Sequence, residues 1–204
     1  RRNSIGMRRW VRARSITAGR VETDDGVVEG RCVVVATDPP TAAELLPGLH
    51  VPPGRSVTTW YYLADTEPAR LTGGDPVLVV DGQRRGPVVN TVVLTHAAPS
   101  YASGGRVLVS ASALGEHDAT TEPLVRRHLS LLYDVPTGGW ENVAAYAIPY
   151  ALPAMTVPLQ VRQPVSLGEW LFVAGDHRDT ASIQGAMVSG RRSADAVLAH
   201  LRRS

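Results

Sequence analysis

The sequence predicts a mixed α/β fold, and two strand-to-helix junctions with a strand-rich middle are the observations that predict it. The first junction is the apolar run 32–36, which ends in Asp-Pro-Pro and begins a short helix near residue 40. The second is the run 171–174, which stops at Gly-Asp and leads through small residues into an amphipathic helix. Between them, residues 55–113 have the pattern of successive strands.

The N-terminal part has the pattern of a β-meander followed by a buried strand. Alternating residues at 10–14 and 20–23 predict two strands, and the Asp-Asp-Gly at 24–26 is a strong hairpin turn. The continuous apolar run 32–36 is typical of a strand covered on both faces. The single cysteine, Cys32, lies in this run, so we expect a buried core thiol rather than a nucleophile.

The middle of the chain is expected to form a separate sheet domain. Residues 47–53 are rich in proline and glycine, which predicts a crossing between domains. Glycine-rich turns separate four expected strands of an antiparallel sheet, at 57–63, 77–80, 87–94 and 106–113. The spacing over 121–134 predicts a helix with His128 as a partly buried residue, and a strand is expected over 143–148.

Composition excludes several classes of protein and site. The chain is 44% hydrophobic and 20% charged, as in ordinary globular proteins, and it has no apolar run long enough to span a bilayer and no visible signal peptide. A cytoplasmic protein is therefore expected. All 21 basic residues are arginine, which excludes P-loop and Schiff-base chemistry. Scattered arginine pairs and unpaired histidines predict neither nucleic-acid binding nor a metal site.

The loop after the second buried strand carries the clearest signal for a ligand. Asp176 follows the strand directly, and Gly185 and Ala186 are expected to leave the first helical turn open to another molecule. Because a helix N-terminus favours negative charge, the residues alone predict a site for an anionic or hydrogen-bond-accepting ligand. Residues 177–180 are expected to form a solvated loop, and Ser189 lies inside the helix without a hydrolase elbow.

Two segments resemble a known family. The run VAGD with SIQGAMVSGRRSADAVL resembles the C-terminal flavin-binding signature of the amine oxidase and phytoene desaturase superfamily of FAD-dependent oxidoreductases. The upstream run VVVATDPPTAA resembles the strand-to-helix junction that these proteins carry in the same domain. The resemblance implies a Rossmann-like FAD-binding domain in two pieces, 1–54 and 166–204, with a substrate-binding domain of mixed or antiparallel sheet inserted over 55–165.

The resemblance also implies which residues contact FAD. The valine of the ribbon that touches the adenine end matches Val11, although an ordinary strand valine fits this position equally well. By the same resemblance, Ala36 and Thr37 approach the flavin side, and Asp176, after Gly175, binds a ribityl hydroxyl. The opening of the last helix completes the implied contacts with Ser182, Ile183, Gln184, Gly185 and Ala186.

The activity that the resemblance implies is hydride transfer from a small-molecule substrate to flavin N5, with no catalytic acid or base from the protein. The N–H groups of the last helix would stabilise the reduced flavin. The inserted domain would supply an apolar substrate pocket from aromatic residues, foremost Trp60, Tyr62 and Tyr150, with core packing as the alternative. The absence of lysine favours an apolar, desaturase-type substrate, and an amine remains open.

The family's G-x-G-x-x-G loop for the FAD pyrophosphate is missing from the 204 residues. The chain also begins without methionine. We therefore expect the C-terminal half of a longer oxidoreductase or a truncated relative, with the other half in the same gene or in a partner chain. The rival hypothesis is a non-catalytic subunit or scaffold module that retains the substrate domain. A glycine-rich segment upstream or in a partner would separate the two.

Overall fold

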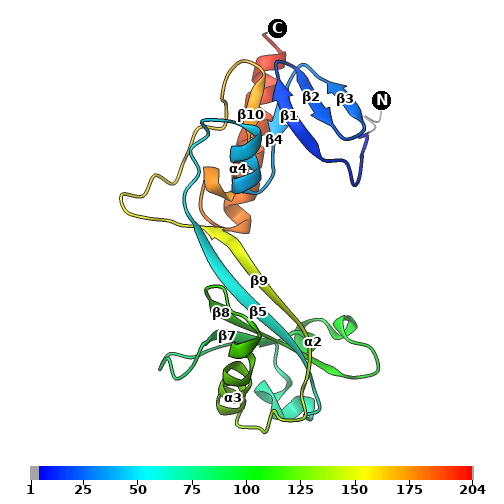
Figure 1. The fold of residues 1–204 in the computed structure, drawn as a ribbon, viewed down its shortest axis with the longest axis vertical. Helices are drawn as coiled ribbons and strands as arrows, with labels where there is room; N and C mark the ends of the chain where they lie inside the picture. Colours follow the sequence, from blue (N-terminus) through cyan, green and yellow to red (C-terminus); the bar gives the residue numbers. More distant parts are fainter. Residues whose placement is uncertain (1–4, 204) are drawn as a thin grey trace. The chain divides into compact units, whose positions relative to one another are not determined.

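Figure 1 shows the computed structural model of the chain, which describes residues 5–203. The chain divides into two compact units: unit 2 is Gly54–Ala151, and unit 1 comprises the parts before and after it. The second crossing thus lies at residue 151 rather than at 165 as expected. Backbone bonds tie the intervening segment to unit 1, because the Ala154 N–H donates to the Pro53 carbonyl at 2.8 Å. Residues 1–4 and 204 of the predicted domains lie outside the described part.

A three-stranded antiparallel sheet opens unit 1. Its strands are β1 (Ala13–Thr17), β2 (Arg20–Thr23) and β3 (Gly26–Glu29), in the order β1-β2-β3. The turn between β2 and β3 lies where the Asp-Asp-Gly sequence predicted it, with Gly26 at a φ of 108°. The first strand begins later than predicted, because Trp10 has a φ of 63° and a fully exposed side chain.

A parallel strand pair joins the two ends of the sequence in unit 1. Strand β4 (Val33–Val35) pairs in parallel with β10 (Leu171–Val173), and each leads into a helix, α1 (Pro39–Leu45) or α4 (Ile183–Leu201). Asp38 caps α1, since its carboxylate accepts from the Thr41 N–H at 3.1 Å. Both predicted strand-to-helix junctions are therefore present.

One face of β4 is less covered than the apolar run predicted. The core of unit 1 contains Val35, Ala42, Leu46 and Val173, which places α1 against the parallel pair. Val34 alternates to the other face and is 44% exposed, so the prediction of a strand covered on both faces is wrong for the described residues. Cys32 precedes β4 and is half-buried, not part of this core.

Unit 2 is a five-stranded sheet with α3 (Glu122–Tyr133) packed on one face. The strand order is β6-β7-β8-β5-β9, and the β6–β7, β7–β8 and β8–β5 pairs are antiparallel, as predicted for this region. The strands are β5 (Gly54–Ala64), β6 (Leu78–Val80), β7 (Val88–Val93), β8 (Val107–Leu114) and β9 (Glu141–Pro153). Alternate residues of β5 and β8 meet Val125 and Leu129 of α3 in one hydrophobic core.

The remaining helical elements are short. They are α2 (Leu94–Ala97) and the 3₁₀ turns Pro68–Arg70, Thr72–Gly74, Pro99–Tyr101, Ala119–Thr121 and Asp176–Arg178. No helix within residues 5–203 combines the length and the apolar character needed to cross a membrane.

A buried polar pair connects α3 to the loop that precedes β7. His128 accepts the Val88 N–H at Nδ1 (3.1 Å), which places the ring proton on Nε2, and Nε2 lies 2.9 Å from the Asp81 carboxylate. Both side chains are almost completely buried. Gly86 lies against the ring, because a Cβ there would be 2.5 Å from His128 Cγ. His128 is thus fully buried rather than partly buried, and it fixes the loop by two hydrogen bonds.

The Asp81 carboxylate should make unit 2 sensitive to acid. Burial raises its pKa, but N–H donors from Arg85, Gln83 and His128 outweigh burial and lower the pKa to about 2. The pKa of an aspartate in the unfolded chain is about 4. The carboxylate therefore stabilises the fold above about pH 4, and this contribution is lost as the pH falls toward about 2. Denaturation of wild type and Asp81→Asn between these limits should show a steeper loss of stability in the wild type. Parallel pH profiles would contradict the assignment.

Candidate functional site

The carboxyl ends of β4 and β10 form the candidate site, and they lie within unit 1. The two strands end side by side, since the Ala174 N–H donates to the Val35 carbonyl at 2.9 Å. Ala36 and Thr37 continue β4 beyond this point, and Gly175 and Asp176 continue β10. The fold therefore brings together predicted residues from both ends of the sequence. Ligands of open parallel sheets bind at this end of the strands.

Two serines of α4 hold the end of β10 in place. Ser189 Oγ accepts from the Gly175 N–H at 2.9 Å and donates to the Gly175 carbonyl at 2.7 Å. One turn further, Ser193 Oγ donates to the Val173 carbonyl at 2.8 Å. Both serines are buried. Ser189 lies inside the helix as predicted, and it has a structural role. The four-residue spacing of these serines is the signal that sequence reasoning missed.

The segment after Asp176 is buried, so the prediction of a solvated loop over 177–180 is wrong for its first two residues. His177 and Arg178 are 4% and 5% exposed as whole residues. Gly175 makes room for the imidazole, because a Cβ at this residue would lie 2.5 Å from His177 Nδ1. Its φ of 155° also favours glycine. The Gly-Asp-His sequence thus allows the His177 ring to pack against the backbone of Gly175.

Arg178 and Arg192 hold the loop after β10 in place by hydrogen bonds. Arg178 Nε donates to the Pro164 carbonyl at 3.0 Å, and its guanidinium also reaches the His50 carbonyl. Arg192 of α4 donates to the Asp179 carboxylate at 3.2 Å and to the Gln163 carbonyl at 2.6 Å. These bonds tie the segment around residues 163–164 to the loop after β10. Hydrogen bonds from a charged guanidinium are stronger than those between neutral groups. The bonds of Arg178 and Arg192 therefore explain why the loop is packed rather than solvated.

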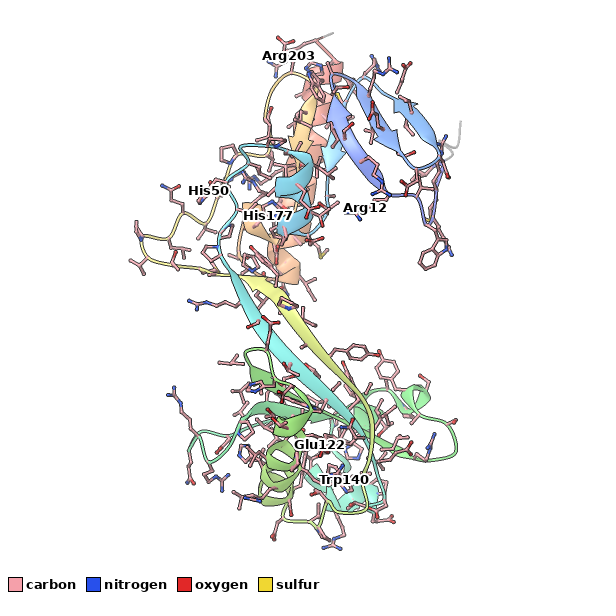
Figure 2. All side chains as sticks on the ribbon, viewed as in Figure 1. Arg12, His50, Glu122, Trp140, His177 and Arg203 are labelled. Carbon is pink, nitrogen blue, oxygen red and sulfur yellow. The ribbon has the colours of Figure 1, made fainter. Side chains whose placement is uncertain are left out.

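A hollow of about 280 Å³ opens beside Asp176 and His177. Figure 2 labels His177 and His50, which both contribute to its wall. Burial raises the pKa of Asp176. Burial also lowers the pKa of His177 to about 4, with the Arg178 charge acting in the same direction and Asp38 against it. His177 is therefore neutral near pH 7. The other lining residues are Pro52, Pro153, Ala154, Met155, Thr156, Pro158, Leu159, Gln160, Gln163, Asp179 and Ala181.

A second hollow of about 350 Å³ in unit 1 brings Val11 and Thr37 together. Val11 precedes β1 and Thr37 follows β4, and both line its wall. The remaining lining residues are Arg12, Ala13, Arg14, Thr41, Glu44 and Leu45. Ala36 is exposed at the end of β4 and lines neither of these two hollows. The structure thus joins two of the three predicted residues from the N-terminal part in one pocket.

The opening of α4 offers two free backbone donors. Ser182 is the N-cap, and its Oγ accepts from the Gly185 N–H at 3.0 Å. The N–H of Ser182 itself donates to the Thr180 carbonyl at 2.7 Å. The N–H groups of Ile183 and Gln184 have no acceptor within residues 5–203, and both side chains are exposed. An incoming acceptor therefore meets two donors at this helix end.

Glycine is required at residue 185 by packing within the protein, not by the approach of a ligand as expected. It is buried, and a Cβ at this residue would collide with the Thr180 carbonyl oxygen. The missing side chain therefore makes room for the preceding loop rather than for a ligand. Ala186 is half-buried, and its N–H donates to the Ser182 carbonyl at 3.0 Å. Neither residue offers a free N–H, so contacts of these two with a cofactor remain predictions that would involve other atoms.

The family is decided by comparison with known proteins. The profile described as flavin containing amine oxidoreductase matches residues 10–198, which is nearly the whole chain. The chain belongs to this family. FAD is accordingly the cofactor of the group to which it belongs, as the sequence resemblance implied. Comparison with curated protein sequences gives no match.

Solved structures similar to this amine oxidoreductase family member share its fold at low sequence identity. An oxidoreductase from Methanosarcina mazei is 12% identical, with a TM-score of 0.62 over 91% of this chain and 49% of its own. Reduced UDP-galactopyranose mutase is 11% identical, with a TM-score of 0.60 over 92% and 46%. Halogenase PltM is 10% identical, with a TM-score of 0.56 over 95% and 42%. The chain spans about half the length of these proteins.

The residues of this family member fit a flavin cofactor in three respects. The buried His177 ring has no hydrogen-bond partner at either nitrogen within residues 5–203. The Ile183 and Gln184 N–H groups are free donors, and Asp176 supplies an acceptor. The sequence has no G-x-G-x-x-G loop for the pyrophosphate, so these residues fit only the flavin end of the cofactor.

Residues 5–203 contain no cluster of three or more side chains able to hold a metal ion.

The predicted substrate residues lie in unit 2, mostly in its core. Trp60 is 1% exposed, but it borders a hollow of about 510 Å³ together with Glu122 and Arg126. Tyr62 has no exposed surface and packs near Trp140, which favours the core role that the sequence left open. The ring of Tyr150 is half-buried and lies over Gly54. A substrate role for these residues remains a prediction.

Proposed function

We propose that this chain supplies the flavin end of the FAD site and the substrate-binding unit of an FAD-dependent oxidoreductase, as the C-terminal half of a longer protein. The observation that carries the proposal is that β4 and β10 lie side by side and end together. Thr37 follows the carboxyl end of β4, and Asp176 and the opening of α4 follow that of β10. The family match and the half-length similarity to solved oxidoreductases support it.

Each polar group at this edge has a defined task in the proposal. Bound FAD would accept a hydride from the substrate at N5. Asp176 would accept a hydrogen bond from a hydroxyl of the cofactor. The N–H groups of Ile183 and Gln184 would donate to the electron-rich edge of the ring, where a helix N-terminus favours negative charge. The site then requires no acid or base from the protein.

The substrate class is proposed from the family and the composition together. The family profile is that of amine oxidoreductases, which favours an amine, whereas the absence of lysine favours an apolar, desaturase-type substrate. Unit 2 would contact the substrate through Trp60 and Tyr150, since Tyr62 is wholly enclosed. Oxidation assays with secondary amines and with isoprenoid alkenes would separate the two classes.

Replacing Asp176 by alanine in the full-length protein should weaken flavin retention about tenfold, the effect of one lost hydrogen bond. The matched control is Asp195→Ala, because Asp195 is an exposed residue of α4 and lines none of the described pockets near the strand ends. Flavin released on gel filtration or dialysis measures retention. Equal retention by both variants and the wild type would remove Asp176 from the site.

Absorption spectra of this chain and of the full open reading frame test the function as a whole. Flavin bands in the full product and none in the short chain would place the pyrophosphate loop in the other half. A full product that stays colourless with added FAD would overturn the oxidoreductase proposal. The non-catalytic scaffold would then be the better account of a chain that lacks the G-x-G-x-x-G loop.

A further inference from the structure

Arg178 in unit 1 is buried without a counter-charge. It is the only buried arginine among residues 5–203. No carboxylate of this described part forms an ion pair with it, and the adjacent Asp179 is bonded to Arg192 instead. Burial lowers the pKa of Arg178, and the charge of Arg192 acts in the same direction. Because a buried charge without an opposite charge is costly, Arg178 favours an anionic partner.

Arg178 also lies in the wall of another hollow of unit 1, of about 520 Å³, which we name the Arg178 hollow. The guanidinium donates to the Pro164 carbonyl from Nε and Nη2, and to the His50 carbonyl from Nη1 at 3.4 Å. Pro164 and His50 line the same hollow. A guanidinium has five N–H groups, so one N–H on each Nη has no acceptor among the described residues. Two such donors suit the two oxygens of a carboxylate.

The rest of the Arg178 hollow is mainly apolar. The end of β1, the segment that follows α1 and the segment 163–171 form its wall. The apolar residues that line it include Ile16, Leu45, Leu49, Leu167, Trp170 and Leu171. Within the described part of the chain, no aspartate or glutamate lines it, whereas Asp176 and Asp179 line the hollow beside the strand ends. Its volume is within the range of small-molecule sites, about 300–1,000 Å³.

We propose that the Arg178 hollow binds an amphipathic carboxylate, with the carboxylate at Arg178 and the aliphatic or aromatic body against the apolar wall. The positive charge selects an anion, and the apolar lining selects a hydrophobic body over an inorganic anion. Among the described residues, this hollow shares only His50 and Gln163 with the hollow beside Asp176. The ligand is therefore separate from the flavin, and the site does not depend on the proposed function.

The test compares decanoate with decanol in isothermal titration calorimetry of the full-length protein. The two probes have the same aliphatic chain, and only decanoate carries a charge. Wild type should bind decanoate about tenfold more tightly than decanol. Arg178→Gln should weaken decanoate binding about tenfold and leave decanol binding within about twofold of wild type, because only the charged contact is lost. Arg178→Lys, which keeps the charge, should restore part of the decanoate affinity.

Leu167→Asp is a second variant that leaves the buried arginine in place, and Leu167 is 39% exposed. It adds a carboxylate to the wall, so it should weaken decanoate binding by about tenfold or more, and more than decanol binding. The matched control is Arg162→Gln, because Arg162 is exposed and does not line the hollow. It should change either affinity by less than about twofold. Thermal unfolding of each variant reports folding separately from binding.

Three results overturn the proposed site. If folded Arg178→Gln or Leu167→Asp binds decanoate as wild type does, the probe is bound elsewhere. If Arg178→Gln loses both probes equally, loop packing rather than charge is responsible. If wild type binds decanoate no better than decanol, Arg178 does not recognise the carboxylate. Should Arg178→Gln fail to fold, Leu167→Asp alone decides. All three results leave the flavin proposal standing, because flavin retention is measured separately.

Discussion

His128→Ala should lower the free energy of unfolding of unit 2 by about 3 kcal/mol. The substitution removes a buried side chain and with it the acceptor of the buried Val88 N–H. It also leaves the Asp81 carboxylate without its imidazole donor, although the Arg85 and Gln83 N–H groups remain. Since the loop before β7 is held by these bonds, it should lose its protection from hydrogen exchange together with the N-terminal part of β7.

The matched control for this prediction is Arg127→Ala. Arg127 is the residue of α3 that precedes His128, is exposed, and has no ion pair among the described residues. Its replacement should change the free energy of unfolding by less than about 0.5 kcal/mol. Chemical denaturation followed by tryptophan fluorescence measures both variants, because Trp60 and Trp140 lie in the core of unit 2. Similar small effects for the two variants would show that the histidine does not fix the loop.

Glycine-to-alanine substitutions at two positions of α4 should have opposite signs. At Gly185 the new methyl group meets the Thr180 carbonyl, so the backbone must shift, at a cost of about 2 kcal/mol. At Gly190 an added Cβ would meet no atom outside its own helix turn within 4 Å. Alanine there should stabilise the helix by up to about 1 kcal/mol. The same chemical change in the same helix thus separates a packing requirement from helix propensity.

Thermal unfolding of Gly185→Ala and Gly190→Ala, with the double variant, measures these effects. Gly185→Ala should also weaken flavin retention, because the shifted loop carries the cap that presents the Ile183 and Gln184 donors. Gly190→Ala should leave retention unchanged. If both substitutions stabilise the protein, the close packing of Thr180 on α4 is refuted, and with it the explanation of why residue 185 is glycine.

Local patterns in the sequence were sufficient to predict most of the secondary structure and the two strand ends that form the candidate site. Apolar runs that end in Asp-Pro-Pro and Gly-Asp mark β4 and β10, because proline has no N–H to donate to a sheet and glycine disfavours a strand. Glycine-rich turns marked the antiparallel sheet of unit 2 for the same reason. The motifs at the two ends of the chain indicated the flavin-containing family, which the comparison confirmed.

Only the tertiary structure decided which polar residues are buried. His177 and Arg178 lie in a polar stretch, and both are buried. The Arg178 guanidinium donates to the carbonyl groups of Pro164 and His50, which lie 14 and 128 residues away in the sequence. The acceptor of the Val88 N–H likewise lies 40 residues further along, on His128. Such contacts follow from how elements pack, and no local period records them. The sequence therefore determined the strands, the turns and the family, whereas packing determined the wall of the site and the unsatisfied imidazole within it.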